Sequence, residues 1–412
     1  MSRNLSEHIR PLLRGGRLGA LLWSFSGQVA VSAVALVGSA VTAQLLGPAG
    51  KGELAVLTLG GIVAANLLSL GVPYGLARAY LLGRSGTVLG SAAAHAAVAL
   101  PLGVVALVVV PLVAPVSPVV LAILIFAIVP ASVFSEDMGG ALIAAKALKA
   151  WQLARLLSVS TFSAGVAVLL VLDRPSVTGA LTLFAAGSLA AVVVQAIVAS
   201  RRWGFASRLS WHELRELSAR NYVGTLADRL LSRVDQFLVA AVSGSAAVGI
   251  YGVAVNVSEV GQYLGNAFGM SVLEDRASLP DRDIVRIALL AAGAVGTLMV
   301  PVCIAAWFLV APVFGDGFRD ARVVALLLAP GVAARAAAVV VIQPLMARGE
   351  GRVCSIISGG VLVLGVAAWY AGAELGGING AAIANSLVYV LQACLLIVVP
   401  ILAVRRERSP LG

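Results

Sequence analysis

The chain has 412 residues, of which 60% are hydrophobic and 12% are charged, and its mean hydropathy is +1.00. Soluble globular domains carry about 25% charged residues, so this composition excludes an ordinary soluble domain. The net charge of +10 resides in basic clusters between long apolar segments, which indicates membrane topology rather than a nucleic-acid partner.

Apolar segments long enough to cross a hydrocarbon core, which takes about 20 residues, recur along the whole chain. The first half predicts six of them, near residues 18–46, 54–82, 88–110, 118–145, 151–172 and 177–200. The second half predicts six more, near 218–243, 248–273, 284–311, 321–347, 352–372 and 377–403. The short alternating segments of a transmembrane β-barrel are absent. The sequence therefore predicts an all-α polytopic membrane protein with about twelve transmembrane helices.

Two basic tails and one polar connector divide the chain into units. The predicted units are a tail at 1–17, a six-helix bundle at 18–200, a connector at 201–217, a second six-helix bundle at 218–403 and a tail at 404–412. The first apolar segment is much longer than the core of a signal peptide, which has about 7–15 residues. We therefore expect an uncleaved first helix.

Basic residues are distributed unequally over the two predicted sides of the membrane. The side with both tails and the connector carries 22 of the 29 Lys and Arg residues, counted with the adjoining helix ends. The opposite side carries four, which are Lys51, Arg174, Arg319 and Arg322. Cytoplasmic loops are enriched in Lys and Arg. The tails and the connector are therefore predicted to be cytoplasmic, in a multi-pass protein of the cell (inner) membrane.

The two halves resemble each other where their first two helices join. The first connection reads Leu46-Gly47-Pro48-Ala49-Gly50-Lys51-Gly52, and the corresponding one reads Val242-Ser243-Gly244-Ser245-Ala246-Ala247-Val248-Gly249. Gly52 and Gly249 are 197 positions apart, close to half the chain. Two homologous bundles with a binding site between them are a common plan for transporters.

Three motifs in this order resemble a known family. They are Leu46-Gly47-Pro48-x-x-x-Gly52, Asp235 followed by Val248-Gly249-Ile250-Tyr251-x-x-Ala254, and Gly377-Ile378-Asn379-Gly380-Ala381-Ala382-Ile383-Ala384. Over about 18–403 the chain is similar to the polysaccharide and oligosaccharide flippases of the MATE-like exporter superfamily. The resemblance implies two six-helix lobes in a V that open alternately to each side, and export of lipid-linked sugars.

Polar residues gather on one face of the seventh and of the eighth predicted helix. The first face carries Asn221, Thr225, Asp228, Ser232 and Asp235, whose spacing of four, three, four and three places them within an arc of about 80°. The second carries Asn256, Glu259, Tyr263 and Asn266. In a membrane protein such faces indicate a polar cavity.

Eight charged residues lie well inside the predicted helices. They are Glu136, Asp137, Asp228, Arg229, Arg233, Asp235, Glu259 and Arg335. Uncompensated charges at the membrane centre cost about 3 kcal/mol each, more in total than a folded protein's whole stability of about 5–15 kcal/mol. They must therefore pair, hydrate, or both. Pairing of Asp228 or Asp235 with one of the three arginines is the structural alternative to a functional site.

The chemistry of these residues fits a charged lipid-linked sugar. Arginine matches phosphate geometry, so Arg229, Arg233 and Arg335 are candidates to bind a diphosphate. Candidates to bind the sugar hydroxyls are Gln28, Asn66, Asn256, Gln262 and Asn266. Buried carboxylates are candidates to couple a proton or sodium ion, with Glu259 and Asp235 first and Asp228, Glu136 and Asp137 after them.

The sequence predicts no cofactor and no metal. Cys303, Cys354 and Cys394 lie in apolar segments without metal-ligand spacing, and His8, His95 and His212 are scattered. The family resemblance implies membrane lipid, a lipid-linked oligosaccharide, a coupling ion and other polysaccharide-assembly proteins as partners. No nucleic-acid partner is expected.

Two other functions remain open at this point. A multidrug exporter of the same superfamily would favour carboxylate-dominated, aromatic-lined sites for cationic drugs, whereas this chain has three arginines within its helices. A membrane glycan polymerase or ligase would be expected to have a sizeable outer loop, but the longest outer connection is about ten residues, near 312–321. A non-enzymatic flippase is the favoured interpretation.

Overall fold

The computed structural model describes residues 17–106, 116–205, 207–218, 222–273, 281–347 and 351–407, and the regular structure in those ranges is helical. Eight helices there are long and apolar enough to cross a membrane. Three of the eight run through a break at Gly47, Gly244 or Gly377, so each supplies two crossings. With α4 (Val88–Ala106) they account for twelve helices, and the predicted all-α polytopic fold is confirmed. The predicted tail at 1–17 lies outside the described residues except for Arg17, and of the tail at 404–412 only residues 404–407, the end of the last helix, are described.

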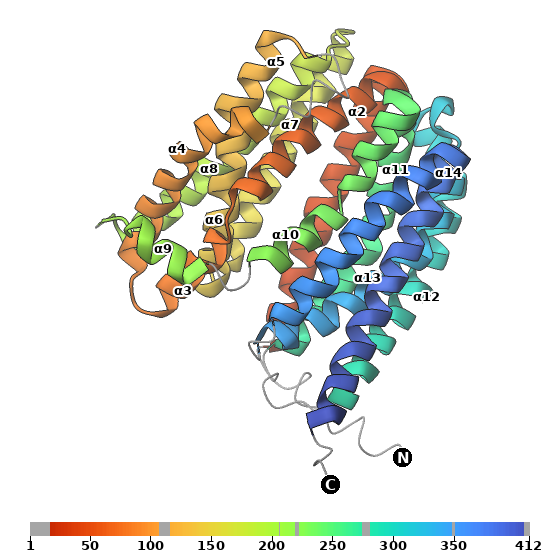
Figure 1. The fold of residues 1–412 in the computed structure, drawn as a ribbon. Helices are drawn as coiled ribbons and strands as arrows, with labels where there is room; N and C mark the ends of the chain where they lie inside the picture. Colours follow the sequence, from red (N-terminus) through yellow and green to blue (C-terminus); the bar gives the residue numbers. More distant parts are fainter. Residues whose placement is uncertain are drawn as a thin grey trace.

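The first half of the chain forms one group of helices (Figure 1). In chain order it contains α2 (Arg17–Leu68), α3 (Val72–Leu81), the 3₁₀ turn η1 (Ser85–Thr87), α4, α5 (Pro118–Ile123), the π-helical turn η3 (Leu124–Ile128), α6 (Val129–Ala144), α7 (Leu148–Val171) and α8 (Val177–Trp203). We call this group the N-lobe. Its core is a continuous apolar cluster that includes Leu57, Leu76, Leu124 and Met138.

The second half forms a second group beside the first, drawn in green to blue in Figure 1. It contains α10 (Tyr222–Leu231), α11 (Val234–Leu273), α12 (Asp281–Phe314), the 3₁₀ turn η5 (Asp316–Phe318), α13 (Ala321–Ala347) and α14 (Gly351–Glu407). We call this group the C-lobe. The connector contains the short helix α9 (Trp211–Ser218).

Glycines reverse the chain where each lobe begins. Gly47 has a φ of 64° and Gly244 a φ of 83°, a left-handed region that residues with a Cβ seldom adopt. The two resulting hairpins pack against each other: a Cβ at Gly52 would overlap the carbonyl oxygen of Ser245, and one at Gly249 would overlap that of Pro48. We call this the hairpin end of the molecule. The repeated glycines allow the two lobes to touch there.

Two crossing helices are interrupted, which the sequence analysis did not predict. The second crossing breaks between α2 and α3, where Leu70 and Gly71 have positive φ values of 46° and 76°. The seventh breaks at Ser232 and Arg233, between α10 and α11. Both breaks expose backbone groups to side chains of neighbouring helices, and both contribute to the site described below.

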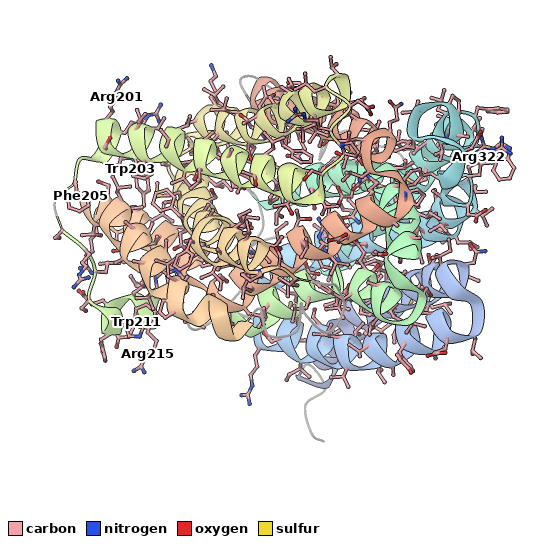
Figure 2. All side chains as sticks on the ribbon, turned by 90° about the horizontal axis from the view of Figure 1, so that it is seen from above. Arg201, Trp203, Phe205, Trp211, Arg215 and Arg322 are labelled. Carbon is pink, nitrogen blue, oxygen red and sulfur yellow. The ribbon has the colours of Figure 1, made fainter. Side chains whose placement is uncertain are left out.

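The connector is anchored to the N-lobe, at what we call the connector end. Leu209 and Leu214 are buried in the N-lobe core, whereas Phe205 and Trp211 are more than half exposed. Figure 2 shows Arg201 and Arg215 at the same edge as Trp203, Phe205 and Trp211. Hydrogen bonds from the side chain and backbone of Ser210, then from Arg84 at 2.8 Å, lower the pKa of the Glu213 carboxyl from 4.5 to about 2.

Candidate functional site

Each of the three arginines predicted within the helices contacts a carboxylate. The distances are 2.7 Å for Arg229–Glu136, 3.1 Å for Arg233–Glu259 and 3.3 Å for Arg335–Asp228. Six of the eight charges identified in the sequence are therefore compensated in pairs. The partners are far apart in the chain in every case, which places the pairs at contacts between helices.

The Arg229 pair joins the two lobes. One terminal nitrogen of Arg229, from α10, donates to Glu136 of α6, and the other donates to Asn66 of α2 at 2.6 Å. The side chains of Arg229 and Glu136 are 27% and 45% exposed, so they remain accessible between the lobes. Tyr222 of α10 adds a hydrogen bond of 2.7 Å to the carbonyl of Leu67.

The Arg233 pair lies on the C-lobe side of the same region. Its partner Glu259 also accepts a hydrogen bond from Tyr263 at 3.3 Å. Glu259 and Tyr263 both belong to α11. The side chains of Arg233 and Glu259 are 32% and 22% exposed. This pair is therefore also accessible to a ligand.

The Arg335 pair lies within the C-lobe. The Arg335 side chain is only 11% exposed, and its guanidinium stacks on the ring of Tyr389 at 5.0 Å. Its partner Asp228 is 29% exposed and lies near the amide of Gln392. The geometry is that of the structural alternative, a buried ion pair that holds helices together.

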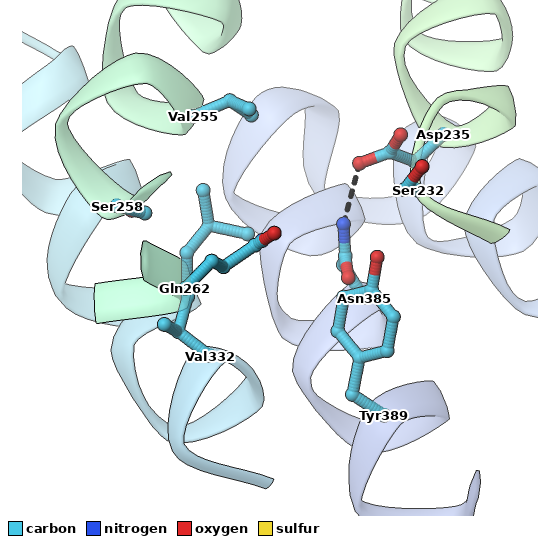
Figure 3. A pocket seen from close by; sticks show the side chains of 9 residues that line it. Ser232, Asp235, Val255, Ser258, Gln262, Val332, Asn385 and Tyr389 are labelled. Atoms are coloured by element: carbon cyan, nitrogen blue, oxygen red, sulfur yellow. Dashed lines mark hydrogen bonds between the residues drawn. The ribbon is translucent and has the colours of Figure 1, made fainter. Parts of the chain in front are cut away.

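Asp235 has no ion pair with any described residue. Tyr251 at 2.8 Å and Asn385 both donate to one oxygen of its buried carboxylate. The other oxygen, Oδ1, is buried without a hydrogen bond, and so is Oδ1 of Asn385. Both residues line a cavity of about 20 Å³, room for about one water molecule, together with Ser232, Ser258, Gln262 and Tyr389 (Figure 3).

The side chains predicted to bind sugar hydroxyls do not form one group. Gln28 and Asn66 face the region between the lobes, where each accepts a hydrogen bond from an arginine. Gln262 lines the Asp235 cavity, and Asn256 donates to the hydroxyl of Ser39 at 2.9 Å. Asn266 is exposed. Asn221 and the side chain of Thr225, from the predicted polar face, lie outside the described residues.

Arg155 was missed as a site residue because it was counted with the basic residues of a helix end. The structure places it within α7, where its Nη1 donates to Gln28 at 2.6 Å and its guanidinium lies 4.8 Å from the centre of the Trp151 ring. Among the described residues, no carboxylate is within ion-pair distance of Arg155. Arg155 is the eighth residue of α7, two turns from the helix end, and this depth is the feature of the sequence that could have identified it as a site residue.

His95 was also missed, because it was interpreted as an isolated histidine. It contacts Asp137, one of the predicted coupling carboxylates, with Nδ1 and Oδ2 2.7 Å apart. The side chains are 3% and 0% exposed. The other ring nitrogen, Nε2, lies 3.0 Å from the carbonyl oxygen of Leu68. No group of three or more metal-ligating side chains occurs in the described ranges.

Comparisons with known proteins identify the fold. No family model and no curated protein sequence matches the chain. An inward-facing multidrug resistance MATE family transporter of the MOP superfamily superposes with a TM-score of 0.65 at 14% identity, over 92% of this chain and 96% of that one. The lipid II flippase MurJ in an inward closed conformation superposes with a TM-score of 0.69 at 9% identity, over 93% of this chain and 87% of that one. A MATE structure in the straight conformation superposes with a TM-score of 0.60 at 16% identity, over 97% of this chain and 98% of that one. The expected MATE-like fold is confirmed.

Proposed function

We propose that this protein is a flippase that moves a polyprenyl-diphosphate-linked oligosaccharide from the inner to the outer leaflet by alternating access. The observation that supports it is the charged cluster between the lobes. Arg229 and Arg233 are paired there with Glu136 and Glu259, whereas Arg155 has no carboxylate within ion-pair distance among the described residues, so its positive charge is unpaired. An excess of positive charge within a membrane favours an anionic ligand. A diphosphate headgroup supplies that anion.

The ion pairs suit a ligand that must be released again. The bonds from Arg229 to Glu136 and Asn66 cross from one lobe to the other, so they must break when the lobes separate there. A diphosphate offers replacement acceptors of the same geometry. Substrate binding and separation of the lobes are thereby linked at one residue.

Ion coupling is proposed at Asp235. Two unbonded oxygens, Oδ1 of Asp235 and Oδ1 of Asn385, belong to residues that line the same small cavity. Oxygen atoms coordinate small hard cations and can also bind a proton. Glu259, the other first choice from the sequence, is already neutralised by Arg233. Asp235 is therefore the preferred coupling carboxylate.

The charge balance disfavours the alternative of a multidrug exporter, although MATE transporters share the fold. A cationic drug would meet a cluster that is already positive. A glycan polymerase or ligase is disfavoured because the similar solved structures named above are transporters and a flippase.

Removal of Arg155 should strongly reduce transport while it leaves the ion pairs of Arg229 and Arg233 in place. A hydrogen bond to a charged group contributes about 1.5–3 kcal/mol, so Arg155→Ala should weaken binding of a diphosphate about 10- to 100-fold. Arg155→Lys retains the charge without the planar fork and should retain partial activity. The measurement is flipping of a fluorescent polyprenyl-diphosphate oligosaccharide in reconstituted vesicles, with Arg319→Ala, an exposed arginine at the hairpin end, as the matched control. Full activity of Arg155→Ala would contradict the proposed function.

The proposed orientation places the connector end in the cytoplasm. Ser207 of the connector and Ser245 of the second hairpin are both exposed, at opposite ends of the molecule. In a cysteine-free background, an impermeant maleimide should label Ser245→Cys, but not Ser207→Cys, in intact cells. The opposite labelling pattern would show that the orientation is reversed.

A further inference from the structure

The buried His95–Asp137 contact lies at the break of the second crossing helix. Three consecutive residues at the end of α2 have partners on other helices: Asn66 accepts from Arg229, the Leu67 carbonyl from Tyr222, and the Leu68 carbonyl contacts His95. The first two partners belong to α10 of the C-lobe. The third belongs to α4 of the N-lobe, so this short segment connects the two.

The geometry determines how many protons the contact holds. A carbonyl oxygen only accepts hydrogen bonds, so Nε2 of His95 must carry a hydrogen to bond with Leu68. Nδ1 of the same ring lies 2.7 Å from Oδ2 of Asp137, and two such acceptors need a proton between them. The pair therefore contains two protons in this state, either as imidazolium and carboxylate or as neutral imidazole and carboxylic acid. Loss of one proton leaves one of the two bonds unmade.

The neighbouring charged groups are already engaged. Glu136, next to Asp137 on α6, is bonded to Arg229 of α10. The connector helix α9 presents the ring of Trp211, 6.1 Å from that of His95. The adjacent α3 contributes apolar residues to the core, among them Val72, Leu76 and Ala79. Asp137 Oδ1 is buried and has no hydrogen-bond partner among the described residues.

We propose that His95 and Asp137 form a proton-binding site that controls the attachment of α10 to the N-lobe at the connector end. With the proton bound, His95 holds the Leu68 carbonyl and the α2 segment that binds Arg229 and Tyr222. Without it, the one remaining ring hydrogen stays on Nδ1, because a bond to the charged carboxylate is stronger than one to a carbonyl. Nε2 then presents a lone pair to the Leu68 carbonyl, and the segment is released. A role of this site in coupling rests on the proposed transport function. The conformational switch itself requires no substrate.

Distances between spin labels test the switch directly. Leu82 of the N-lobe and Arg282 of the C-lobe are exposed and belong to connector-end elements, and Val171 with Leu375 form a reference pair at the hairpin end. The full chain, with its three cysteines replaced, is labelled in lipid nanodiscs without cargo. Over the range from about pH 5 to about pH 9, the connector-end distance should increase with rising pH. The reference distance should stay constant.

Two variants distinguish this site from other titrating groups. An amide in Asp137→Asn donates to Nδ1 while Nε2 still donates to Leu68, so both bonds form at every pH. We expect the short connector-end distance throughout. His95→Phe keeps a ring but makes neither bond, so the long distance should persist at low pH. His212→Gln, which changes an exposed histidine on α9, should behave like the unmodified protein.

The proposal is overturned if Asp137→Asn keeps the pH dependence, or if the unmodified protein shows none. Loss of the pH dependence in Glu136→Gln but not in Asp137→Asn would assign the switch to Glu136 and also reject it. These distances are measured without substrate, so failure of the proposed flippase activity in vesicles would leave the result unaffected.

Discussion

Replacement of Gly52 by valine (Gly52→Val) should abolish transport by preventing the two lobes from meeting at the hairpin end. Any side chain at this position overlaps the carbonyl oxygen of Ser245, and a backbone group on a packed hairpin cannot move aside as a flexible side chain can. Overpacking costs about 1–3 kcal/mol even where neighbours adjust. The population with a closed hairpin end should fall about 5- to 140-fold, because each 1.4 kcal/mol corresponds to a factor of ten.

The Val171–Leu375 label pair measures this effect, and the distance should lengthen in Gly52→Val. Gly249→Val, which meets the carbonyl of Pro48, should give the same result because the two glycines are equivalent in the repeated hairpins. Gly359→Val is the matched control, since a Cβ there meets no atom within 4 Å. An unchanged distance and normal transport in Gly52→Val would show that the hairpin contact is dispensable.

Arg335→Ala should cause the largest loss of stability among the charge variants. It leaves Asp228 without its partner and removes the guanidinium from the ring of Tyr389. Breaking a buried ion pair costs about 3–5 kcal/mol, and we expect the lower end because Asp228 retains some access to solvent. The thermal midpoint in detergent should fall by about 5 °C or more. Membrane abundance should fall with it.

A second change separates this structural role from binding of a diphosphate. Adding Asp228→Asn to Arg335→Ala removes the uncompensated charge and should restore most of the thermal stability. Export that returns with stability would assign Arg335 to structure alone, whereas stable protein without export would assign it to the ligand. Arg319→Ala breaks an exposed pair with Asp316 and should change stability by less than about 1 kcal/mol. A normal thermal midpoint in Arg335→Ala would disprove the structural role.

The number of helices and their grouping could be predicted because both depend on local properties of the chain. Apolar length predicts the crossings, and the Leu46-Gly47-Pro48 pattern predicts a reversal because glycine tolerates positive φ. The partners of the charged residues could not be predicted in this way. Helical spacing places Arg229 on a face but does not identify Glu136, 93 positions earlier, as the residue opposite.

An interrupted helix explains why His95 could not be predicted as a site residue, and a topology rule explains the same for Arg155. The break after Leu68 leaves a carbonyl that His95 can reach, so a histidine that looks isolated in the sequence becomes part of a buried network. Arg155 shows the reverse error. The rule that basic residues near helix ends lie at the membrane surface led to Arg155 being overlooked, although its side chain points inward and binds Gln28.

The π-helical turn η3 has a consequence for how sequences of this fold are aligned. A π-turn accommodates one more residue than an α-helix would in the same length, and one residue rotates everything after it by about 100°. Glu136 and Asp137 follow η3 on the continuous helix α6, so the extra residue sets which of them points to Arg229 and which to His95. A relative lacking that residue would present different positions to the two partners. Alignments through this helix therefore need a gap within 124–128, and a gapless comparison would misassign both carboxylates.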